Sequence, residues 1–206
     1  MNILIVYDSW TGHTRSLCSA AAHALARLGH DTHLYAVSNG PDVVDGYDLV
    51  IVGTPVHFGP TSRVKAWLRR AGPIPVMAII LSYGAPGAFG RYTLGLTIDS
   101  LRYHAGSVIS VMAVPGFHPI LRTFHGRPDE ADMVFVQAWA RGLTKNAHVY
   151  SASNPWVNQN LPFFCGLAEG IQGSAGLPPD QYIQDPDNPC SSKKWYTRGY
   201  QLTNRY

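Results

Sequence analysis

The chain has 206 residues, of which 46% are hydrophobic and 14% are charged. So low a charged fraction excludes a highly charged disordered chain, and 20 glycines with 15 prolines exclude a long coiled coil, because both residues break helices. The formal net charge of +3 is spread along the sequence without the basic face of a nucleic-acid groove, so we expect no nucleic-acid partner.

The cysteines and the N-terminal segment indicate the compartment. Cys18, Cys165 and Cys190 form no CxxC pair, which argues against a disulfide scaffold and favours a reducing environment. Whether Cys165 and Cys190 pair stays open. The opening apolar run ends at Asp8 and has no basic segment before it, as in a first strand rather than a secretory signal. We therefore predict a cytoplasmic protein with no membrane span.

The first 145 residues alternate short apolar runs with helical patterns. In chain order we expect a strand at 2–7, a helix at 14–28, strands at 32–37 and 48–53, a helix at 61–71, a strand at 75–82, a helix at 89–103, a strand at 107–114 and a helix at 129–143. Leu17, Ala21, Leu25 and Leu28 form one apolar stripe on the first helix. This alternation predicts an α/β domain with a parallel sheet covered on both faces.

The remaining 146–206 segment has a different composition. It contains six prolines and five glycines and shows no sustained helical or strand period. It is also rich in aromatic residues, which disordered tails usually lack, so we expect it to pack either on the sheet domain or on a second subunit. The sequence thus predicts a domain at 1–145, an irregular C-terminal extension at 146–206, and a homo-oligomer formed through the extension.

The first strand leads into a loop rich in hydroxyl groups. Ser9, Thr11 and Thr14 surround Gly12 at the expected start of the first helix, where backbone N–H groups lack partners and the helix end is electropositive. The loop contains neither the lysine of a Walker loop nor a GxGxxG pattern, so a phosphate monoester fits it best. An ordinary helix capped by Ser9 or Thr11 is the alternative.

Two further loops follow the third and fourth expected strands. In the first, His57 and Phe58 can flank a planar ring, and Gly59 permits close approach of the backbone to a ligand; the alternative is a rigid loop packed on the sheet edge. In the second, residues 82–90 include three glycines whose N–H groups can reach a heterocycle, and the alternative is a flexible turn.

These three loops at successive strand ends make the chain resemble the flavodoxin-like family. The resemblance rests on SWTGHT after the first strand, YDLVIVGTPVHFGPTS around the third and IILSYGAPG at the fourth, and it covers about residues 1–145. It implies a doubly wound, five-stranded parallel sheet of order 2-1-3-4-5 that binds FMN non-covalently. The GTPVHFG segment looks more like the NAD(P)H:quinone oxidoreductase branch than like small flavodoxins.

The resemblance also assigns residues to the cofactor. The FMN phosphate would contact Ser9, Thr11, Gly12, His13 and Thr14. The ring would be bordered by Trp10, Pro55, Val56, His57, Phe58, Gly59, Ser82, Tyr83, Gly84 and Gly87, with Phe117 as a further neighbour. His57 and His118 are candidate catalytic residues, because histidine can stabilise the reduced cofactor or protonate a quinone oxygen near neutral pH. Each can equally be a loop residue with a structural hydrogen bond. No histidine spacing suggests a metal site.

Three functional hypotheses follow, in this order. The first is an FMN-dependent oxidoreductase that passes electrons from a reduced nicotinamide nucleotide to a quinone-like or other small acceptor. The second is a non-enzymatic, flavodoxin-type electron-transfer protein that needs a redox protein partner. The third is an interaction module with this fold that has no cofactor and assembles through its aromatic extension.

Overall fold

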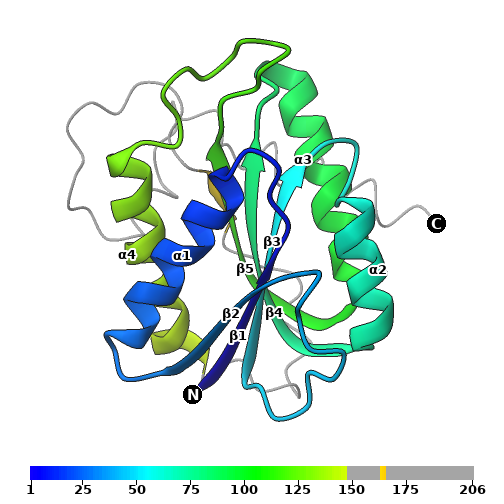
Figure 1. Cartoon of the computed structure of the whole chain (residues 1–206), viewed down its shortest axis with the longest axis vertical. Helices are drawn as coiled ribbons and strands as arrows, with labels where there is room; N and C mark the ends of the chain where they lie inside the picture. Colours follow the sequence, from blue (N-terminus) through cyan, green and yellow to red (C-terminus); the bar gives the residue numbers. More distant parts are fainter. Residues whose placement is uncertain (148–162, 166–206) are drawn as a thin grey trace.

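The computed structural model describes residues 1–147 and 163–165, with the side chains described for residues 1–144 (Figure 1). The elements in chain order are β1 (Asn2–Tyr7), α1 (His13–Ala26), β2 (Asp31–Ala36), β3 (Leu49–Val56), α2 (Ser62–Ala71), β4 (Ile74–Tyr83), α3 (Gly87–Arg102), β5 (Ala105–Pro115), α4 (Glu130–Ala147) and β6 (Phe163–Cys165). The predicted oligomer contact through the extension and a bond between Cys165 and Cys190 lie outside what is described.

The strands form one parallel sheet of order β2-β1-β3-β4-β5-β6. The first five strands confirm the predicted α/β architecture and the order 2-1-3-4-5. The sixth is an addition from the segment that the sequence analysis treats as irregular: Phe163–Cys165 pairs in parallel with Val111, Met112 and Ala113 of β5. The extension therefore contributes one short strand to the edge of the sheet.

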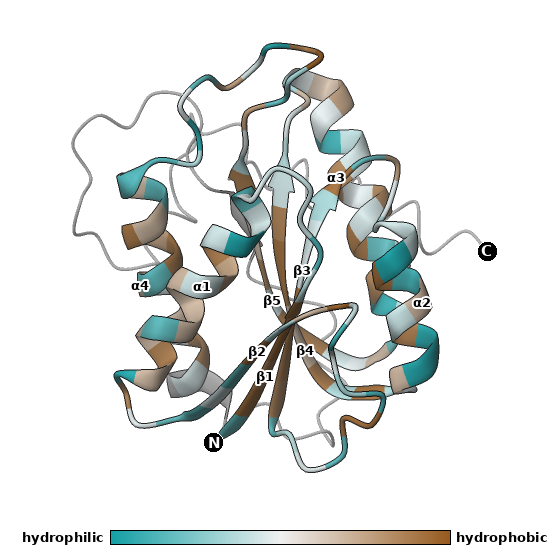
Figure 2. Ribbon diagram, viewed as in Figure 1, coloured by the Kyte–Doolittle hydropathy of each residue, from teal (hydrophilic) through white to brown (hydrophobic). Residues whose placement is uncertain are grey.

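Helices cover both faces of the sheet, with α1 and α4 on one side and α2 and α3 on the other (Figure 1). Alternate residues of β1 enter the two layers: Ile3 and Ile5 belong to the core under α1 and α4, and Leu4 and Val6 to the core under α2 and α3. The central strands are apolar along most of their length, as a sheet buried on both faces requires (Figure 2). No helix among the described residues is long and apolar enough to cross a bilayer.

Several predicted boundaries differ from the structure: α4 ends at Ala147 instead of residue 143, and the ends of β3 and α1 differ as well. The strand expected to end at Gly53 continues to Val56, where Pro55 and Val56 pair with Ser82 and Tyr83 of β4. β1 ends opposite Gly53, so the strand beyond that point has β4 as its neighbour on one side, and a proline without an N–H group is tolerated there.

The first helix is shorter than expected. It ends at Ala26, so Leu28 lies outside it and is exposed instead of joining the apolar stripe. The left-handed backbone of Gly29 reverses the chain toward β2, as a glycine at a helix end commonly does.

Candidate functional site

The β1–α1 loop has a helix start without a side-chain cap. Gly12 is the N-cap residue, with a φ of 90° that favours glycine, and no side chain bonds to the first amides of α1. The carbonyl of Gly12 accepts hydrogen bonds from the amide of Ser16 at 2.9 Å and from its hydroxyl at 3.2 Å. Capping by Ser9 or Thr11 is therefore not what the structure shows, and the electropositive end of α1 is available to an anion.

Two residues that were predicted to contact the cofactor, Thr14 and Ser82, are hydrogen-bonded to each other instead. The side chain of Thr14 is buried, and its Oγ1 lies 2.8 Å from Oγ of Ser82, which is buried too. This hydrogen bond ties the first turn of α1 to the end of β4. Thr14 and Ser82 thus have a structural role in positioning the loop, which sequence spacing does not reveal because 68 residues separate them.

His13 begins α1 and faces the end of β5. A Cβ atom on Gly116 would lie 3.0 Å from Nδ1 of His13, so the glycine is what admits the imidazole. Burial lowers the pKa of His13 from its ordinary value, which favours the neutral ring beside the loop.

Asp8, which no sequence pattern marks as a site residue, immediately precedes the loop. It is only 4% exposed, and its Oδ1 accepts a hydrogen bond from the amide of Ser9 at 3.0 Å. The same oxygen lies 3.6 Å from Nη1 of Arg63 in α2, which brings a cation to a loop that has none of its own. Oδ2 of Asp8 and Oγ of Ser9 are buried and have no hydrogen-bond partner among the described residues.

Exposed aromatic rings surround the ends of β1 and β3. Trp10 is 68% exposed, and its ring centroid lies 4.7 Å from that of His57. Phe58 is 73% exposed and packs edge-on against Phe89 of α3 at 5.6 Å. Gly59 follows with a φ of 136°, which turns the chain toward α2. The structure therefore brings Trp10, His57 and Phe58 together at the carboxyl ends of β1 and β3. All three are predicted neighbours of the ring.

The pKa of His57 is lowered from its ordinary value. Desolvation by burial is the main cause, and the positive charge of His118 contributes in the same direction, while Asp8 opposes both. His57 therefore lies within electrostatic range of both His118 and Asp8, although the three residues are far apart in the sequence.

The β4–α3 loop begins at residues that are buried against the β5–α4 loop. Tyr83, a predicted ring neighbour, is buried and packs edge-on against Phe124 at 5.7 Å. Gly84 follows, and a Cβ atom there would lie 2.5 Å from Cβ of His118, so only glycine fits. Gly87 opens α3 with a φ of 63°.

The β5–α4 loop, residues 116–128, folds back on the end of β4. The amide of Gly116 donates to the carbonyl of Tyr83 at 2.8 Å, and the hydroxyl of Thr123 donates to the carbonyl of Gly84. Nδ1 of His118 accepts a hydrogen bond from the amide of Leu121 at 3.1 Å. Because Nδ1 acts as the acceptor, the neutral imidazole of His118 carries its proton on Nε2.

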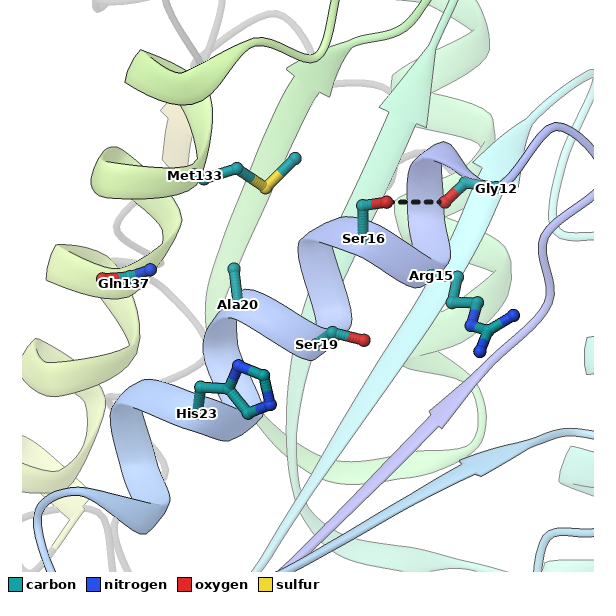
Figure 3. A pocket seen from close by; sticks show the side chains of 8 residues that line it. All are labelled: Gly12, Arg15, Ser16, Ser19, Ala20, His23, Met133 and Gln137. Atoms are coloured by element: carbon teal, nitrogen blue, oxygen red, sulfur yellow. Dashed lines mark hydrogen bonds between the residues drawn. The ribbon is translucent and has the colours of Figure 1, made fainter.

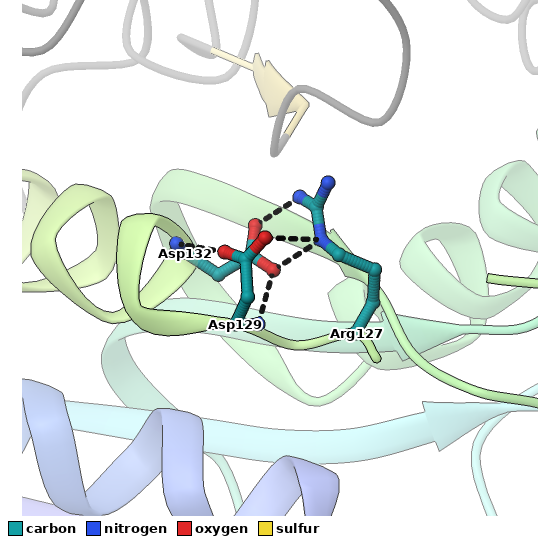
Figure 4. Close-up of polar contacts among 3 residues, drawn as sticks. All are labelled: Arg127, Asp129 and Asp132. Carbon is teal, nitrogen blue, oxygen red and sulfur yellow. Dashed lines mark hydrogen bonds and ion pairs between the residues drawn. The ribbon is translucent and has the colours of Figure 1, made fainter. Parts of the chain in front are cut away.

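An ionic cluster secures the far end of this loop. Arg127 donates from Nε to Oδ2 of the buried Asp132 at 2.6 Å and from Nη2 to Oδ1 of the same carboxylate (Figure 4). Asp129 joins the cluster, since its amide donates to Asp132 at 2.9 Å and its Oδ1 accepts from the amide of Asp132 at 3.0 Å. The carbonyl of Arg127 accepts from the amide of Phe117, which links the cluster to the start of the loop.

A groove of about 530 Å³ lies elsewhere, between α1 and α4 (Figure 3). It shares only Gly12 with the predicted cofactor contacts. It is lined by Gly12, Arg15, Ser16, Ser19, Ala20, His23, Met133 and Gln137. In the described part of the chain, no three His, Cys, Asp or Glu side chains gather in a way that would hold a metal ion.

Comparisons with known proteins bear on the fold. No protein-family model matches the chain, and no curated protein matches its sequence. Among solved structures, a flavodoxin from the domain Archaea has a TM-score of 0.56 at 12% identity, over 72% of this chain and 99% of that one. Oxidised Flavodoxin 1 from Bacillus cereus also has a TM-score of 0.56 at 12% identity, over 70% and 98% of the two chains.

A larger protein contains a similar domain. The rubredoxin oxygen:oxidoreductase from Desulfovibrio gigas has a TM-score of 0.51 at 16% identity, over 72% of this chain and 36% of that one. The common strand order and the coverage of whole flavodoxins show that residues 1–147 have the flavodoxin-like fold.

Proposed function

We propose that this protein binds FMN non-covalently at the carboxyl ends of β1, β3 and β4 and uses it in an electron-transfer reaction. The observation that carries the proposal is the uncapped start of α1 beside the buried, unpartnered hydroxyl of Ser9. A phosphate ester supplies what both lack, because its oxygens accept hydrogen bonds from backbone amides and from a hydroxyl.

The neighbouring loops fit the rest of the cofactor. Trp10 and Phe58 offer exposed aromatic faces to a planar ring, and Gly84 lets His118 pack against the end of β4. Thr14 and Ser82 act by holding α1 and β4 together rather than as direct ligands. The similar solved structures include flavodoxins, which agrees with this use of the fold.

For the reaction we propose transfer of electrons from a reduced nicotinamide nucleotide to a quinone-like or other small acceptor. FMN supplies the redox chemistry when it is bound, since it accepts a hydride and releases electrons singly or in pairs. The protein's part is to hold the cofactor and to deliver protons. His118 is the candidate donor, because Leu121 fixes its Nδ1 as an acceptor and leaves the proton on Nε2. His57 lies within electrostatic range of it as a second titrating group.

Electron exchange with a redox protein is the second candidate function. It is favoured by the open arrangement of Trp10 and Phe58, whose exposed rings would leave a bound ring accessible to a large partner. The two functions share the cofactor and differ in whether the protein reacts with small donors and acceptors.

An absorbance titration tests both steps. We expect purified protein to bind FMN stoichiometrically and to shift its visible spectrum, and we expect NADH or NADPH alone to bleach the complex within seconds and to support turnover of a soluble benzoquinone. Binding without bleaching would favour the redox-partner function. Absence of any FMN binding would contradict the proposal and leave the hypothesis of a cofactor-free interaction module.

A further inference from the structure

The β1–α1 loop contains its own anion. Asp8 is almost fully buried, and its Oδ1 takes the hydrogen bond of the Ser9 amide, the first amide of the segment in which a phosphate would bind. A carboxylate next to a phosphate site has a cost, because like charges repel strongly where water is excluded. A loop that served only to hold a phosphate would gain affinity from a neutral residue at this position.

The second oxygen of Asp8 lacks a donor. Oδ2 is enclosed and unpartnered, and so is Oγ of Ser9 next to it. A buried carboxylate oxygen without a hydrogen bond is destabilising, and such atoms in native proteins are usually paired with water, an ion or a ligand. No acidic cluster accompanies Asp8 in the described part of the chain, so the chemistry favours a hydrogen-bond donor over a metal ion.

Arg63 does not supply the hydrogen-bond donor that Oδ2 of Asp8 lacks. It lies 3.6 Å from Oδ1, the oxygen that Ser9 already uses, and its side chain is 69% exposed. An ion pair at that distance is weak when its cation is largely in solvent. Both unpartnered atoms are enclosed, so a ligand would have to displace the side chains that cover them.

We infer that Asp8 is a specificity-determining residue: it opposes a bare phosphate and accepts a hydrogen bond from a hydroxyl group of a ligand that carries its phosphate on a polyol chain. The inference rests on the proposed function for the identity of that ligand, since the ribityl phosphate of FMN has this chemistry. The hydroxyl of Ser9 would donate a hydrogen bond to the phosphate, and Asp8 would accept one from a hydroxyl group of the polyol chain beside it.

A cycle of two ligands and two proteins tests the inference. The ligands are FMN and a flavin whose phosphate is carried on an unsubstituted pentyl chain. The proteins are the full-length wild type and Asp8→Asn, in which the amide oxygen can still accept from Ser9. By flavin fluorescence quenching, we expect the wild type to lose about tenfold or more in affinity when the hydroxyls are removed, and Asp8→Asn to lose at most about threefold.

Inorganic phosphate provides an arm that needs no flavin. We expect Asp8→Asn to bind phosphate about tenfold more tightly than the wild type, because a like charge is removed and an N–H donor is added. Isothermal titration at low ionic strength measures this. Arg63→Gln should change phosphate affinity in the opposite direction, which separates the charge of Asp8 from the loss of the ion pair. Asp42→Asn, which removes an exposed carboxylate paired with Arg70, is the matched charge control.

Each outcome decides between the alternatives. Equal discrimination between the two flavins by the wild type and Asp8→Asn would overturn the inference, as would phosphate binding that is unchanged or weaker in Asp8→Asn. A general rise in phosphate affinity that Asp42→Asn shares would reduce the effect to net charge and overturn it as well. If the wild type binds no flavin, the proposed function fails, and the inference about the charge of Asp8 stands or falls on the phosphate arm.

Discussion

At the scale of single residues, the site depends on side chains that hold one another. Thr14 of α1 is hydrogen-bonded to Ser82 of β4, and the ring of His118 is fixed by the amide of Leu121. These contacts limit which groups are left to act on a ligand. The hydroxyl of Ser9 and Nε2 of His118 remain, one at the phosphate end of the proposed site and one at the loop that follows β5.

The Nε2 proton of His118 is open to a direct test. In His118→Asn, the side-chain oxygen can still accept from the amide of Leu121, but no group remains at the position of Nε2. We expect turnover with a soluble quinone to fall by about tenfold to a hundredfold with little change in FMN affinity, since one proton donor is lost. His118→Gln, which places an N–H near Nε2 but cannot give up a proton, should not recover the rate; recovery would show that a hydrogen bond is all that His118 supplies. Equal activity of wild type and His118→Asn would exclude His118 as the donor.

His13 gives a prediction for stability. Burial lowers its pKa in the folded protein below the ordinary value of 6.5. The unfolded chain therefore binds more protons than the folded one between the lowered pKa and 6.5, and the contribution of the neutral ring is lost as the pH falls through that window. We expect the urea midpoint to drop between pH 7.5 and pH 5.5, and to drop less in His13→Asn. A midpoint in His13→Asn that falls as steeply as in the wild type would exclude this residue.

At the scale of elements, the ends of strands and helices decide what is available to a ligand. The alternation of apolar runs and helical patterns is local, and it predicts β1, β4 and the start of α1 nearly to the residue. The extension of β3 through Pro55 depends on where β1 stops, which is a property of the sheet and not of the segment. Asp8 escapes prediction for a similar reason, because its significance comes from its burial and from Arg63 of α2.

The anchor at the start of α4 is the element on which the β5–α4 loop depends. Arg127→Met would leave Asp132 buried without the guanidinium that neutralises it, so we expect a loss of about 3 kcal/mol in the free energy of unfolding. Urea denaturation measures this. Arg70→Met is the control, since its guanidinium pairs with the exposed Asp42, and there we expect a loss below about 1 kcal/mol. Similar losses for both variants would show that the burial of Asp132 does not increase the loss in the free energy of unfolding.

At the scale of the whole molecule, the residues whose side chains are described form two cores, one on each face of the sheet. The buried residues of the layer under α1 and α4 run from Ile3 to Leu143, and those of the layer under α2 and α3 run from Leu4 to Ala113. The similar flavodoxins are covered almost completely by about 70% of this chain. The coverage of the flavodoxins leads us to predict that residues 1–147 fold without the residues that follow them.

A chain shortened to residues 1–147 tests this division. Because the core residues described for both layers remain, and β6 is the described strand that leaves the sheet, we expect a single cooperative thermal transition by circular dichroism and unchanged FMN affinity. If the extension joins subunits, the full-length protein should be an oligomer by light scattering and the 1–147 chain a monomer. A shortened chain that unfolds without cooperativity would show that the sheet needs the extension, because β5 would then lack the neighbour that protects its edge.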